Sequence, residues 1–138
     1  MRKFLSISLL ITCLFSFEVA NAVGLNGAVA SSKEEASQIG IDILKKGGNA
    51  IDAAVSVAFA LAVTHPSAGN IGGGGFMVIR LANGTVTTID FREKAPLLST
   101  KDMFLDEHGD VIQNKSRYTS WASGVPGSVA GFGMAHEK

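Results

Sequence analysis

The segment from Ala50 to Val63 constrains the fold most, because it is apolar on nearly every side of a helix. Only Asp52 and Ser56 interrupt it, and Asn49 before it is a good N-cap residue. A helix without a polar face must be buried on most sides. The sequence therefore predicts a domain larger than a two-helix unit, with this helix ending near His65-Pro66.

A second helix is expected just before this one. Ser32 and Glu35 have the spacing of a capping box, and Gly47-Gly48 would end the helix. Residues 27–30 are small and apolar and suggest a short strand upstream.

A β-hairpin is expected downstream. Strands are predicted over 76–81 and 85–91, joined at Asn83-Gly84, whose residues both tolerate the positive φ of a type I′ turn. The order helix, helix, hairpin suits an α/β fold of the layered α+β kind.

The first 22 residues predict an export signal. Arg2 and Lys3 precede an apolar run, and Ala20-Asn21-Ala22 offers the small-x-small pattern cut by signal peptidase. The apolar run is shorter than the roughly 20 residues of a transmembrane helix, so no stable membrane anchor is expected. We interpret residues 1–22 as a signal peptide, residues 23–138 as the mature region, and its location as periplasmic or extracellular.

The composition of the mature region excludes several classes of site. Its net charge is about −1 once the leader is removed, which argues against nucleic-acid binding. The chain's one cysteine, Cys13, is lost with the leader, so no disulfide or thiolate nucleophile is expected. The histidines at 65, 108 and 136 have no metal-ligand spacing. We therefore predict no metal and no cofactor.

Glycines 72–75 form the most unusual local feature. They match neither a phosphate-binding loop, which needs a following Gly-Lys-Ser/Thr, nor a dinucleotide fingerprint, which joins a strand to a helix. From the residues alone the run is either a linker or a place where backbones approach closely. No Gly-x-Ser-x-Gly nucleophile elbow is present in the sequence.

Arg92 is the candidate binding residue, because it follows the second predicted strand. A guanidinium in that place can hold a substrate carboxylate through two parallel hydrogen bonds. The alternative is a surface ion pair with Glu93. The residues alone leave both interpretations open.

Several segments in order resemble the beginning of a γ-glutamyltranspeptidase (glutathione hydrolase) precursor. They extend across essentially the whole mature region, and one contains the pattern Phe-Arg-Glu-x-Ala-Pro. The matching segments are Gly27-Ala28-Val29-Ala30-Ser31, Gly47-Gly48-Asn49-Ala50-Ile51-Asp52-Ala53-Ala54, Gly72-Gly73-Gly74-Gly75-Phe76-Met77, Asp90-Phe91-Arg92-Glu93-Lys94-Ala95-Pro96 and Gly124-Val125-Pro126-Gly127-Ser128-Val129-Ala130-Gly131.

The resemblance implies part of an αββα N-terminal-nucleophile hydrolase sandwich, made from a precursor that cleaves itself into large and small subunits. It implies that the new N-terminal threonine of the small subunit attacks the γ-glutamyl amide of glutathione and related compounds. It also implies that Arg92 holds the α-carboxylate of the γ-glutamyl group, which favours the clamp over the surface ion pair.

No threonine of this chain matches the family's processing site, so no catalytic residue is assigned here. We expect the chain to be the N-terminal part of a large subunit, whether as a fragment, a frameshifted gene or half of a split gene. It should be inactive without the small subunit. Two alternatives remain: a secreted non-catalytic binding remnant, and part of a related acylase or poly-γ-glutamate depolymerase.

Overall fold

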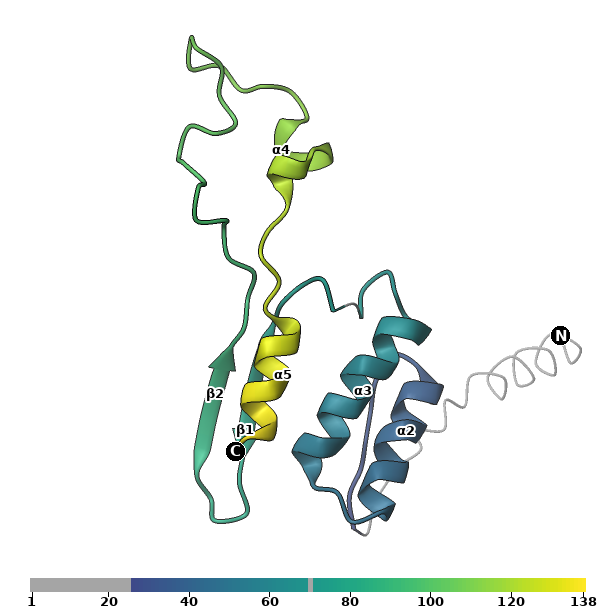
Figure 1. The fold of residues 1–138 in the computed structure, drawn as a ribbon. Coiled ribbons are helices and arrows are strands. Elements are labelled where there is room, and N and C mark those ends of the chain that lie inside the picture. Colours follow the sequence, from purple (N-terminus) through teal and green to yellow (C-terminus); the bar gives the residue numbers. More distant parts are fainter. Residues whose placement is uncertain (1–25, 70) are drawn as a thin grey trace, which may run out of the picture.

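The computed structural model describes residues 26–69 and 71–138. The predicted signal peptide lies outside these residues and stays a prediction. The elements are α2 (Glu34–Lys45), α3 (Ala50–Thr64), β1 (Phe76–Arg80), β2 (Val86–Asp90), α4 (Lys115–Tyr118), η1 (Ser120–Ala122) and α5 (Ser128–His136). In Figure 1, α2 and α3 lie side by side, and α5 lies between α3 and the β1–β2 hairpin.

The α2–α3 connection forms as the glycines and Asn49 predict. Gly47 has φ of +92°, and the amide of Gly48 donates to the carbonyl of Ile43 at 3.0 Å, which ends α2 in a Schellman motif. The Asn49 side chain then accepts from the amide of Asp52, whose carboxylate accepts from the Asn49 amide at 2.8 Å. This reciprocal capping box confirms the predicted beginning of α3.

The beginning of α2 differs from the prediction. The helix starts at Glu34 after an N-cap at Lys33 that makes no side-chain capping bond, so the Ser32–Glu35 capping box is wrong. The hydroxyl of Ser31 instead bonds the Lys33 carbonyl and the Ser37 hydroxyl, each at 2.8 Å. Ser31 thus makes local bonds around the beginning of α2, but no serine side chain caps the helix.

Residues 27–30 are not a strand, which corrects the second upstream prediction. A strand needs a partner for its ladder, and among the described residues none bonds to this segment. Val29 packs instead on α2, where a Cβ added to Gly40 would lie 2.8 Å from its Cγ1.

The hairpin is confirmed, with antiparallel pairing from Phe76↔Asp90 to Arg80↔Val86. Its turn differs from the predicted type I′. Gly84 alone of the turn residues has positive φ, and the Leu81 amide donates to the Thr85 carbonyl at 2.9 Å. This is a three-residue loop with glycine in the left-handed position.

The faces of α3 are unequally covered. Ala53 and Val57 are buried against α2, and Phe59 meets Phe132 of α5 edge to face at 5.5 Å. Val63, however, is 81% exposed. The prediction that α3 is buried on most sides is therefore not met within the described residues. None of the helices described at 26–69 and 71–138 is long and apolar enough to cross a bilayer.

Residues 95–124 leave this core as an excursion, here called the arm, which carries α4 and η1 (Figure 1). Its two ends meet at Lys94 and Val125, which exchange both backbone hydrogen bonds at 3.1 and 2.7 Å. Near its tip, the Asp106 amide donates to the Asp110 carbonyl at 2.9 Å.

Candidate functional site

Arg92 lies two residues beyond the end of β2. Its backbone amide donates to Oδ1 of Asp90 at 3.0 Å, which fixes the direction in which the chain leaves the sheet. Its guanidinium carbon lies 5.9 Å from the ring centroid of Phe76 on β1. The side chain is 66% exposed, so its donors can be reached by a ligand.

The ion pair between Arg92 and Glu93 does form, but it is weak. Nε of Arg92 is 3.9 Å from Oε2 of Glu93, at the outer range of such contacts, and both side chains are substantially exposed. Exposed pairs of this kind contribute about 0–1 kcal/mol. A substrate carboxylate that binds bidentately to the guanidinium can therefore compete with Glu93.

The backbone beside Arg92 is held by closely packed glycines. A Cβ on Gly74 would lie 2.5 Å from the Phe91 carbonyl oxygen and 2.7 Å from Cα of Arg92. Gly127 has no room for a Cβ either, because the Phe91 carbonyl occupies that space. The glycine run thus serves close backbone packing, the second of the two interpretations that the sequence left open.

Hydrogen bonds lock this arrangement. The carbonyl of Gly73 accepts from the amides of Gly127 and Ser128 at 2.9 and 3.1 Å, so the glycine run holds the beginning of α5. The ring of Phe91 packs on Gly131 and meets Phe132 edge to face at 5.7 Å. Sequence reasoning missed Phe91 as the anchor of the site. Its only signal was its place directly before Arg92.

Two clefts flank the segment that follows β2. The smaller, of about 230 Å³, is lined by Arg92 and Lys94 together with Pro126 and Met134. The larger has a volume of about 510 Å³, and its lining includes Glu93 and Lys94 and, from the arm, Met103, Phe104 and Trp121.

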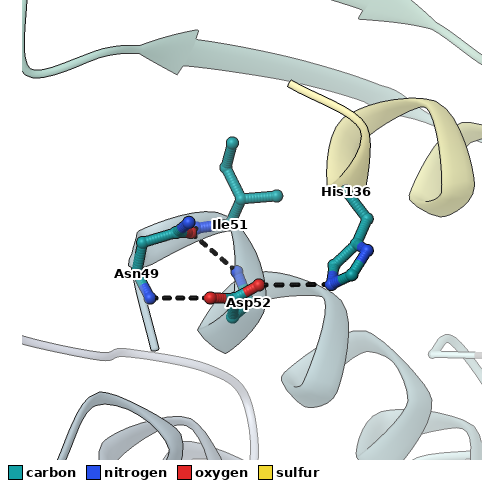
Figure 2. Close-up of polar contacts among 4 residues, drawn as sticks. All are labelled: Asn49, Ile51, Asp52 and His136. Carbon is teal, nitrogen blue, oxygen red and sulfur yellow. Dashed lines mark hydrogen bonds and ion pairs between the residues drawn. The ribbon is translucent and has the colours of Figure 1, made fainter. Parts of the chain in front are cut away.

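The histidines lie apart from this site. His136 of α5 pairs with Asp52 at the beginning of α3, and Nε2 of His108 lies 3.6 Å from Oε1 of Glu107 in the arm (Figure 2 for His136). Over residues 26–69 and 71–138, no three His, Cys, Asp or Glu side chains gather where they could hold a metal ion.

Comparison with known proteins identifies this arrangement. A family described as Gamma-glutamyltranspeptidase matches residues 36–138. The glutathione hydrolase proenzyme of Escherichia coli K12 is 61% identical over 112 residues, which cover 81% of this chain and 19% of that protein. The proenzyme of Bacillus subtilis 168 is 52% identical over 118 residues, covering 84% of this chain and 20% of that protein. The chain thus spans about a fifth of the length of these relatives.

Solved structures of γ-glutamyltranspeptidases and a related transpeptidase also match this chain. The γ-glutamyltranspeptidase of Helicobacter pylori superposes with a TM-score of 0.80 at 56% identity, over 83% of this chain and 33% of that one. The transpeptidase CapD of Bacillus anthracis superposes with a TM-score of 0.59 at 33% identity, over 81% of this chain and 31% of that one. These matches confirm the predicted fold class, part of a layered α/β N-terminal-nucleophile hydrolase fold. The chain belongs to the γ-glutamyltranspeptidase family.

Proposed function

We propose that residues 23–138 form the N-terminal part of the large subunit of a γ-glutamyltranspeptidase that hydrolyses glutathione and transfers its γ-glutamyl group. Arg92 carries this proposal. Its guanidinium is exposed and only weakly paired with Glu93, and Phe91 fixes the backbone beside it. In this role it binds the α-carboxylate of the γ-glutamyl group and so orients the γ-amide for attack.

The nucleophile has to come from elsewhere in such an enzyme. The family resemblance assigns it to a threonine at the beginning of the small subunit, and no threonine of this chain stands in that sequence context. We therefore propose that the small subunit is the functional partner and that residues 1–138 alone do not turn over γ-glutamyl substrates.

Glutathione is favoured over the substrates of related acylases or poly-γ-glutamate depolymerases. The curated relatives named glutathione hydrolase reach 57–61% identity in two bacteria. The two CapD transpeptidase structures reach 33–34%. Proteins that bind the same substrate tend to keep more of their sequence in common. The higher identity to the glutathione hydrolases therefore supports a glutathione-type substrate.

Export is proposed on the leader alone. Cleavage after Ala22 would place Val23 first in the mature protein, in the periplasm or outside the cell. N-terminal sequencing of the secreted chain tests this site, and a chain still beginning at Met1 would contradict it.

The role of Arg92 can be tested in a chimera in which residues 23–138 replace the matching segment of the Escherichia coli relative. Arg92→Lys should lower kcat/KM for γ-glutamyl-p-nitroanilide about tenfold to a hundredfold, mainly through KM, because the bidentate contact is lost. Arg117→Lys, an exposed arm residue that lines neither cleft, is the matched control.

Equal effects of Arg92→Lys and Arg117→Lys on kcat/KM would overturn the assignment of Arg92. The 138-residue chain itself should show no release of p-nitroaniline. Turnover by that purified chain would contradict the need for the small subunit.

A further inference from the structure

Phe76 is a large apolar side chain on the exposed face of the hairpin. It lies at the beginning of β1 and is 67% exposed, although an aromatic ring gains free energy by leaving water. Ile79 and Ile89, on the opposite face, are buried. The role proposed for Arg92 assigns nothing to this ring.

The register of the hairpin brings Phe76 close to Arg92. Phe76 pairs directly with Asp90, so these two side chains share one face of the sheet. Arg92 follows two residues later and projects to the same side, because side chains alternate along an extended chain. Phe91, between them, faces the other way and packs its ring on Gly131. Phe76 and Arg92 are therefore diagonal neighbours, within reach of an aromatic and a long side chain.

The backbones that carry the two side chains are tied together. The Phe91 amide donates to the Gly75 carbonyl at 3.0 Å, which joins the residue before Arg92 to the residue before Phe76. The Arg92 amide donates to Oδ1 of Asp90 at 3.0 Å. Main-chain and capping bonds thus hold the origins of both side chains in place.

The contact between them is one of a cation with an aromatic ring. The guanidinium carbon of Arg92 lies over the Phe76 ring at 5.9 Å from its centroid, within the range of about 6 Å over which a cation is attracted to the ring. This attraction uses the positive charge and occupies no N–H donor. The donors of Arg92 therefore stay available to a carboxylate, for which the competitor is Glu93 at 3.9 Å from Nε.

We propose that Phe76 is a positioning residue, whose ring holds the Arg92 guanidinium in place for the α-carboxylate of a γ-glutamyl substrate. This inference rests on the proposed function, in which Arg92 binds that carboxylate. An exposed arginine loses side-chain entropy when it binds a ligand, and a ring that already restricts the arginine lowers that cost. The ring assists substrate binding and the transition state equally, so its effect falls on KM.

The contact can be measured in the 138-residue chain without substrate. The ring protons of Phe76 should show nuclear Overhauser effects to the side chain of Arg92. Arg80 and Arg117, which are also exposed, are the internal controls and should show none. Phe76→Tyr should keep the effects to Arg92. Their absence in the native chain would overturn the proposal.

The consequence for binding is tested in the chimera with the Escherichia coli relative. Phe76→Leu should raise KM for γ-glutamyl-p-nitroanilide about twofold to fivefold and leave kcat nearly unchanged. Phe76→Tyr keeps the aromatic face and should restore the original KM. Val78→Ala, on the same exposed face of β1, is the matched control and should change neither constant.

A general packing role for Phe76 predicts different results. Equal increases in KM for Phe76→Leu and Phe76→Tyr, or a fall in kcat with KM unchanged, would overturn the positioning role. Arg92→Lys separates this inference from the proposed function. If Arg92→Lys raises KM and Phe76→Leu does not, the clamp stands and the positioning role fails. If Arg92→Lys leaves KM unchanged, the clamp itself fails, and the purpose assigned to Phe76 fails with it even where the Overhauser contact is present.

Discussion

The carboxylate of Asp52 joins α3 to α5, because its Oδ1 lies 3.3 Å from Nε2 of His136 (Figure 2). Its other oxygen, Oδ2, accepts from the Asn49 amide at 2.8 Å. One side chain therefore both caps a helix and holds the last turn of another.

Asp52→Ala should loosen both helix ends. The lost hydrogen bond from the Asn49 amide is worth about 0.5–1.5 kcal/mol, so amides in the first turn of α3 should exchange with deuterium about twofold to tenfold faster. Amides in the last turn of α5 should also exchange faster, because His136 loses its partner. His136→Ala should affect α5 while leaving the Asn49 cap intact. An Asp52→Ala effect confined to α3 would show that the contact with His136 carries no energy.

Two glycines of α5 should respond oppositely to alanine. Gly131→Ala places a Cβ against the Phe91 ring, and overpacking of this kind costs about 1–3 kcal/mol. Gly133→Ala meets no atom within 4 Å, and the change should stabilise the helix by about 0.5–1 kcal/mol. Limited proteolysis of the two variants measures this, and equal cleavage rates would contradict the packing of Phe91.

Gly84→Ala should destabilise the hairpin. Gly84 has φ of +87°, and the left-handed conformation costs a residue with a Cβ roughly 1–2 kcal/mol. Hydrogen exchange across the β1–β2 pairs should quicken, whereas Gly84→Asn should cost less because asparagine tolerates that region. Equal exchange in both variants would mean that the turn does not hold φ positive in solution.

Val63→Lys should reduce self-association of the isolated chain. Val63 is 81% exposed near the end of α3, where a cation also suits the helix dipole. Light scattering and binding of a hydrophobic dye should both fall. Ala53→Lys, at a position only 3% exposed, is the contrasting variant and should increase both signals. Unchanged scattering by Val63→Lys would show that this face does not drive association.

Local chemistry accounts for the parts of the fold that the sequence predicted correctly. Asn49 and Asp52 form their capping box within a single turn, and Gly47 adopts positive φ without help from distant residues. The hairpin and the exposed position of Arg92 follow from the same short-range rules.

The incorrect predictions concern the residue at which a helix begins, or contacts between segments far apart in the sequence. The Ser32 capping box required α2 to begin directly after Ser32, but its N-cap is Lys33, so Ser32 does not occupy the capping position. A strand at 27–30 would need a distant partner to form. The enclosure of Phe91 by Gly74, Gly127 and Gly131 joins segments widely separated in sequence, which no periodicity encodes.

Because Lys94 and Val125 are bridged, the length of the arm can change without changing the geometry of its base. Because two backbone hydrogen bonds close the excursion there, residues added near Asp106–Asp110 would leave the spacing of Arg92 and Lys94 unchanged. Each doubling of a loop costs only about 0.6 kcal/mol of closure entropy. The tip is therefore a suitable insertion point for a reporter domain or an affinity tag, because an insertion there leaves the backbone at Arg92 and Lys94 in place.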